Sequence, residues 1–165
     1  MAATFKLNSK NVITQSGTAE PAISSIVVFP AGHIINIEST KQTSDTADAG
    51  TGTWISDSIT IGSTDSDVLV LISGWVRKSN GGAESGGHTR LYMSGGGFGA
   101  DGSGYQIAGQ IGYGEGASNS ETMLGQSVLD TAPGSTTPTY GLYSSVQSSG
   151  VFRYRLQIVL MEILA

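Results

Sequence analysis

The distribution of apolar and polar residues predicts β-strands along most of this chain. The clearest run comes near the end, where five apolar residues occupy alternate positions: Phe152, Tyr154, Leu156, Ile158 and Leu160. Arginine and glutamine fill the first three positions between them. Because the side chains of a strand point alternately to its two faces, this segment is predicted to be a strand with one apolar side. We expect the five apolar residues to lie in the core or in a subunit interface.

Two segments are apolar on both faces. One is the run 68–72, and the other is the chain end, where Val159, Met161 and Ile163 make the second face apolar as well. A strand of this kind is predicted to be covered on both sides. The terminal segment is therefore either a central strand or part of an interface between subunits.

Shorter stretches between turn residues predict the remaining strands: 24–29, 33–43, 54–61, 89–93, 105–113 and 139–147. The stretch 120–130 is ambiguous, because Met123, Leu124, Val128 and Leu129 would also suit a short helix. About eight to ten short strands separated by turns are typical of a sandwich or jelly roll. We therefore predict an all-β fold, an antiparallel β-sandwich of jelly-roll type.

The first residues follow another pattern. Residues 1–23 consist of short polar and apolar pieces and are predicted to form an extended N-terminal arm, followed by one sandwich domain over 24–165. Four apolar residues in this arm are candidates for attachment to a partner: Phe5, Leu7, Val12 and Ile13.

Composition excludes several classes of partner and chemistry. The formal net charge is −5 and only eight residues are Lys or Arg, which disfavours nucleic-acid binding. The chain has no cysteine, so it forms neither disulfides nor thiolate metal sites. Residues 1–15 do not resemble a signal peptide, and no run of about 18 apolar residues occurs, so we expect no membrane partner.

Catalytic and metal motifs are absent from the sequence. Residues 97–102 match the GxGxxG pattern, but they lead into a predicted strand instead of a helix, so we interpret them as a loop. The aspartates lie in turn-like segments without EF-hand spacing, and His33 and His88 are far apart in the sequence. No GxSxG motif is present. We predict no enzyme activity, no metal site and no cofactor.

The glycine-rich loop around residues 95–104 is a candidate for ligand recognition. Phe98 is an aromatic residue with few apolar neighbours in the sequence, and Asp101 follows it. An aromatic ring exposed in a loop can stack on a sugar or anchor a protein contact. We therefore name Phe98 and Asp101 as possible residues for binding a host glycan.

Three stretches resemble a family of small bacteriophage virion proteins, which serve as capsid decoration proteins or as modules of head and tail fibres. They are residues 29–37 (FPAGHIINI), residues 67–74 (DVLVLISG) after the threonine-containing segment 58–61, and the ending 160–165 (LMEILA). The resemblance spans most of the chain in order. The chain departs from the family at Asp67, where lysine is common, and in its glycine-rich middle.

The resemblance implies a trimeric jelly roll whose N-terminal arm attaches it to the particle. The expected role is that of a decoration or cement protein in the virion, a homotrimer that binds the major capsid protein or another virion protein and stabilises the phage head. The alternative is a fibre tip that recognises host surface glycan through the loops 79–87 and 95–104. A third class, a glycan-processing enzyme, would require a positioned acidic residue.

Overall fold

The chain divides into two compact units, Met1–His33 and Ile34–Ala165. The computed structural model describes residues 3–7, 10–15, 22–23, 31–44, 46–48, 52–78, 89–99, 105–111, 121–131, 133–146 and 151–165. The strand expected at 24–29, the loop 79–87, His88 and residues 100–104 lie outside these ranges. The division falls after His33, whereas the sequence placed the domain boundary after residue 23.

The first unit contains a small antiparallel sheet. Its described strands are β1 (Ala3–Leu7), β2 (Lys10–Gln15) and β3 (Ala22–Ile23), in the order β1-β2-β3. The backbone of these strands is extended. It is also paired with itself, which the sequence did not predict.

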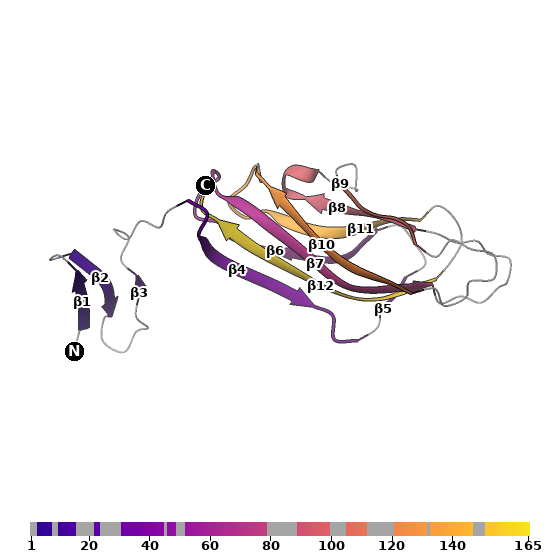
Figure 1. The fold of residues 1–165 in the computed structure, drawn as a ribbon, viewed down its shortest axis with the longest axis horizontal. Coiled ribbons are helices and arrows are strands. Elements are labelled where there is room, and N and C mark those ends of the chain that lie inside the picture. Colours follow the sequence, from indigo (N-terminus) through magenta and orange to yellow (C-terminus); the bar gives the residue numbers. More distant parts are fainter. Residues whose placement is uncertain are drawn as a thin grey trace. The chain divides into compact units, whose positions relative to one another are not determined.

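The second unit is built from two sheets (Figure 1). The first sheet has the order β10-β7-β12-β4, with a short strand β5 that also pairs with β12. Its strands are β4 (Ile34–Lys41), β5 (Thr46–Asp48), β7 (Asp67–Lys78), β10 (Glu121–Asp130) and β12 (Phe152–Ile163). The second sheet has the order β6-β11-β8-β9. Its strands are β6 (Gly52–Ser58), β8 (Thr89–Gly95), β9 (Tyr105–Ile111) and β11 (Thr139–Val146).

The strand pairings of this unit are nested along the sequence. Strand β4 pairs with β12, β6 with β11, β7 with β10 and β8 with β9, all antiparallel. The chain therefore forms a long antiparallel ribbon that turns back between β8 and β9. The additional pairs β7–β12 and β8–β11 roll this ribbon into two sheets. This arrangement is a jelly roll, so the predicted all-β sandwich fold is confirmed.

The core lies between the sheets and is filled by alternate residues of the strands. The five apolar residues singled out in β12 are each at most 3% exposed. Opposite them, Trp54 of β6 stacks on Tyr154, with ring centroids 4.4 Å apart and planes 7° from parallel. A bulge in β6 makes this contact possible, because Thr53 and Ile55 oppose consecutive residues of β11 and leave Trp54 as the extra residue.

A buried carboxylate ties the last strand to the turn between β6 and β7. Glu162 is only 3% exposed, and its Oε1 accepts hydrogen bonds from the Gly62 N–H at 2.7 Å and from the Ser66 hydroxyl at 2.8 Å. Burying a carboxylate is favourable only when such donors replace water. The Met-Glu ending of the chain therefore has a structural role that periodicity did not reveal.

The ambiguous stretch 120–130 forms a strand, and the helical alternative is wrong. Residues 121–130 make an unbroken antiparallel ladder with residues 68–77 of β7. Leu124 and Val128 point into the core, whereas Met123 and Leu129 are exposed. No described residue belongs to a helix long and apolar enough to cross a membrane.

Replacing Gly74 with alanine should destabilise the fold by about 2–4 kcal/mol. Gly74 has φ +135°, and an added Cβ would lie 2.9 Å from the Leu156 Cα and would also clash with the Arg155 carbonyl oxygen. The control is Gly125→Ala, since a Cβ at Gly125 meets nothing within 4 Å. Urea unfolding of both variants measures the difference, and equal stabilities would contradict the predicted clash.

Candidate functional site

The outer face of the first sheet carries a row of apolar side chains that crosses four strands. Met161 of β12 lies opposite Ile37 of β4 on one side and Leu69 of β7 on the other, and Leu69 lies opposite Leu129 of β10. Ile37 is 55% exposed and Leu129 is 47% exposed. We call these four residues the apolar row. Strands in a sheet lie about 4.8 Å apart, so the row is about 14 Å wide.

Neighbouring residues extend this surface along the strands. Ile163 lies opposite Ile34, which is 50% exposed, and Val159 lies opposite Leu71. We expected the doubly apolar strands to be covered on both sides. Both β7 and β12 are central strands, so neighbouring strands supply hydrogen bonds to their backbone groups on both sides. Their outward side chains nevertheless stay partly exposed. Contiguous exposed apolar surface is typical of a protein–protein contact.

The five residues predicted to lie in the core or at an interface are in the core of the chain itself. Phe152, Tyr154, Leu156, Ile158 and Leu160 point between the two sheets. The residues of the apolar row were not singled out as a group in the sequence. Only the register between the strands brings Ile37 and Leu129 into line with Leu69 and Met161.

The arm residues are placed by the register of the first unit. Phe5 lies opposite Ile13, and Ile13 lies opposite Ile23 on the other side. Leu7 lies opposite Lys10, beyond a register shift that follows Phe5. Three of the four candidate attachment residues therefore occupy paired positions, and two of them, Phe5 and Ile13, pair with each other.

A buried hydrogen-bond network fixes the turn that contains Phe98. This turn is the short 3₁₀-helix η1 (Gly96–Phe98), which directly follows β8. The Asp130 carboxylate is 4% exposed, and its Oδ2 accepts hydrogen bonds from the Gly97 N–H at 2.7 Å and from the Tyr140 hydroxyl at 2.8 Å. Gly96, with φ +53°, passes so close to Asp130 and Tyr140 that a side chain would not fit.

Phe98 has apolar neighbours, contrary to the expectation from its glycine-rich sequence. It is partly buried and packs on the core, with its ring centroid 6.3 Å from that of Tyr140 and 6.2 Å from that of Tyr105. These partners come from β11 and β9, so local sequence could not reveal them. Asp101 lies outside the described residues. A ligand-binding role for Phe98 or Asp101 stays a prediction.

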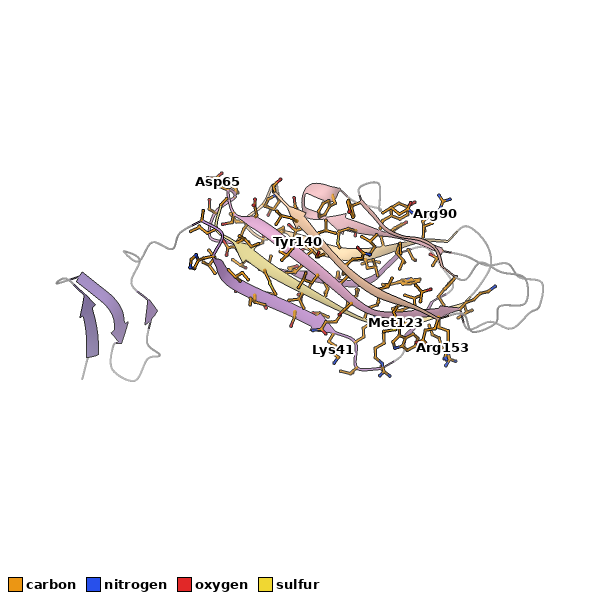
Figure 2. All side chains as sticks on the ribbon, in the orientation of Figure 1. Lys41, Asp65, Arg90, Met123, Tyr140 and Arg153 are labelled. Carbon is orange, nitrogen blue, oxygen red and sulfur yellow. The ribbon has the colours of Figure 1, made fainter. Side chains whose placement is uncertain are left out.

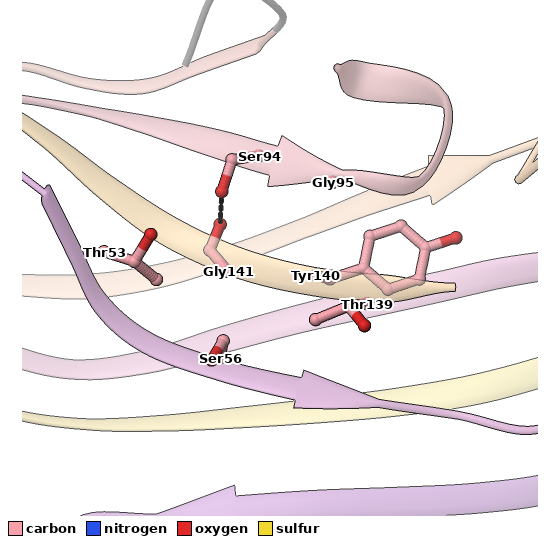
Figure 3. A pocket seen from close by; sticks show the side chains of 7 residues that line it. All are labelled: Thr53, Ser56, Ser94, Gly95, Thr139, Tyr140 and Gly141. Carbon is pink, nitrogen blue, oxygen red and sulfur yellow. Dashed lines mark hydrogen bonds between the residues drawn. The ribbon is translucent and has the colours of Figure 1, made fainter. Parts of the chain in front are cut away.

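Hydroxyl groups line a shallow cavity of about 330 Å³ on the second sheet (Figure 3). Thr53 and Ser56 come from β6, Ser94 from β8 and Thr139 from β11. The Ser94 hydroxyl donates a hydrogen bond to the Gly141 carbonyl at 3.2 Å. The side chains that line this cavity include no carboxylate, imidazole or amine, so they offer neither a general base nor charged metal ligands. None of the described residues forms a group of three or more potential metal ligands.

The comparisons with known proteins give a fold similarity. No family model matches the chain, and no curated protein matches it in sequence. Among solved structures it is similar to that of infectious bursal disease virus Gt strain, at 11% identity and a TM-score of 0.45, over 99% of this chain and 48% of that chain. It is also similar to the VP2 subviral particle of infectious bursal disease virus, at 12% identity and a TM-score of 0.41, over 93% of this chain and 46% of that chain. The chain thus spans less than half the length of either. Similarity of fold at this identity does not define a function.

Burial and the hydrogen bond to Asp130 raise the pKa of Tyr140 well above its ordinary value, so the folded protein keeps this hydroxyl protonated. In the unfolded chain, the tyrosine hydroxyl ionises at about pH 10. The Tyr140 hydroxyl therefore contributes fully to the stability of the fold below that pH, and this contribution is lost as the pH rises above it.

The variant Tyr140→Phe should lose about 1–3 kcal/mol at neutral pH, because the Asp130 carboxylate loses a buried donor. The stability difference from the parent chain should then narrow by about 1.4 kcal/mol per pH unit above pH 10. Unfolding by urea at pH 7, 10 and 11 measures both effects. A stability difference between the two chains that stays constant with pH would contradict the raised pKa of Tyr140.

Proposed function

We propose that this chain is a structural protein of a virus particle, a homotrimer that decorates a bacteriophage head and stabilises it. The apolar row is the observation on which this proposal chiefly depends. Ile37 and Leu129 expose large apolar side chains to water, and covering them with a second protein surface recovers about 25 cal/mol for each Å² buried. The jelly-roll fold, which occurs in capsid proteins, and the resemblance in the sequence to phage virion proteins also support it.

The mechanism proposed is binding alone. Copies of the chain associate through the apolar row, and the N-terminal unit attaches the assembly to the major capsid protein or to another virion protein. Three attachment segments on one trimer increase the effective concentration of each segment at its site once the first has bound. Bound to adjacent capsid subunits, the trimer would hold them together against pressure from the packaged genome.

Introducing charge into the apolar row should dissociate the trimer without unfolding the chain. The test variant is Ile37→Glu with Leu129→Glu, because an unpaired carboxylate at a buried contact costs several kcal/mol. The control is Thr40→Glu with Gln126→Glu, two exposed positions on the same strands whose side chains point away from the row. Analytical ultracentrifugation measures the mass, and circular dichroism checks the fold. A parent chain that sediments as a monomer, or a test variant that stays trimeric, would refute this contact.

Removing residues 1–15 should abolish attachment to particles while leaving a folded trimer. The deletion removes β1 and β2 with the four candidate residues, and the strands of the jelly roll remain complete. Cosedimentation with particles that lack the protein measures attachment. Retained cosedimentation would show that attachment uses another surface.

A fibre tip that recognises host glycan is the second candidate function. A group of cationic side chains beside Trp75 on the first sheet favours it, because such residues can bind the acidic groups of surface polysaccharides. The two candidates differ in copy number, since a decoration protein covers the capsid and a fibre tip occurs in only a few copies. Quantitative labelling of particles in electron micrographs distinguishes them.

A further inference from the structure

Half of the basic residues of this acidic chain lie on one end of the outer face of the first sheet. The chain has eight Lys and Arg residues, and four of them belong to this group: Lys41, Arg77, Arg153 and Arg155. Arg155 lies opposite Trp75, and Arg153 lies opposite Arg77 two residues further along. Figure 2 shows Lys41 and Arg153 on the same side of the unit and Arg90 on the opposite side.

A depression of about 150 Å³ lies within this group. Lys41, Trp75 and Arg155 contribute to its wall, together with the hydrogen-bonding side chains of Ser73 and Gln157. Gly74 also lines it, and its φ of +135° together with the nearby backbone of Arg155 and Leu156 disfavours any other residue there. The depression therefore lies where β7 passes Leu156, at a position that requires glycine.

Arg77 and Trp75 form a second element of this surface. The guanidinium carbon of Arg77 lies 5.7 Å from the centre of the Trp75 ring, a cation–π distance. The Nε of Arg77 is buried and has no hydrogen-bond partner among the described residues. Arg77 is therefore held against the indole ring, beside the depression.

We propose that this depression binds a carboxylate-bearing saccharide. Arginine binds carboxylates through paired N–H groups, and an indole ring packs on the apolar face of a sugar. Ser73 and Gln157 add groups that bond to sugar hydroxyls. A net charge of −5 and a patch of only four cations oppose binding of an extended polyanion such as nucleic acid.

The saccharide site goes beyond the proposed capsid role and does not depend on the trimer, and it gives the ligand class for the second candidate function, the fibre tip. Arg155 and Met161 are six residues apart on β12, which corresponds to about 20 Å along the strand. The depression and the apolar row therefore occupy different parts of the face, and each is tested separately.

Calorimetric titration of the full chain with a panel of oligosaccharides tests the proposal. The panel contains oligomers of galacturonate, glucuronate and sialic acid, with the methyl ester of each as its neutral counterpart. The test variant is Lys41→Gln with Arg155→Gln. The control variant, Lys6→Gln with Arg90→Gln, removes the same charge from β1 and β8.

At least one acidic oligosaccharide should bind the parent chain, and its methyl ester should not. The test variant should bind at least about ten-fold more weakly and the control variant within about two-fold of the parent, because charge-assisted hydrogen bonds are lost only in the former. Unfolding midpoints and sedimentation should be unchanged in both.

Three results would overturn the proposal. They are a panel without binding at millimolar concentration, equal losses in the test and control variants, and a single-stranded DNA oligomer that binds as tightly as the acidic saccharide. The last result would identify a general polyanion surface. None of these results tests the apolar row, because the charge variants of that row are judged by the sedimentation mass of the protein.

Discussion

The ladder between β7 and β12 is the constraint on which the rest of the second unit depends. All twelve residues of β12 pair with β7, from Phe152 opposite Lys78 to Ile163 opposite Asp67. The period of two in each strand then decides which side chains enter the core, and a slip of one residue would exchange the two faces. The same ladder positions β10 and β4 on either side, so the whole first sheet inherits its register from this pair.

On its other side, β12 changes partner midway along the strand, and hydrogen bonds hold this point in place. Strand β12 changes its outer partner from β4 to β5 around Leu156, where Gln42 takes over. The side-chain carbonyl of Gln42 accepts a hydrogen bond from the Leu156 N–H at 2.9 Å, and the backbone N–H of Gln42 donates one to the Leu156 carbonyl at 2.9 Å. The side-chain Nε2 of Gln42 donates a third hydrogen bond to the Trp54 carbonyl at 3.1 Å. Across the strand, Gly74 supplies the unusual backbone conformation. Hydrogen bonding on this side of β12 therefore continues where its partner changes, and the depression beside Trp75 lies at the same point.

The sequence predicted the features that depend on the alternation of residues within one strand. It missed the features that depend on which strands pair and in which register. Residues 152–160 indicated both a strand and its buried face, and the nested order of strands follows from a jelly roll once the class is known. The apolar row was not predictable, because Ile37, Leu69, Leu129 and Met161 are distant in sequence and only the register aligns them. The environment of Phe98 was misjudged for the same reason, since its ring partners come from other strands. Residues 120–130 were ambiguous because apolar residues lie on both faces of this edge strand: Leu124 and Val128 are buried, whereas Met123 and Leu129 are exposed.

The charge of the chain and its apolar surface act over different distances. Copies that each carry a net charge of −5 repel one another, which limits unspecific association of a chain with exposed isoleucine and leucine. At physiological ionic strength this repulsion is screened beyond about 8 Å, whereas burial of apolar surface acts only on contact. A partner must therefore match the shape of the outer face closely before the apolar row can contribute. The acidic composition consequently favours a specific contact over aggregation, and half of the cations that oppose this charge are concentrated at one end of the sheet.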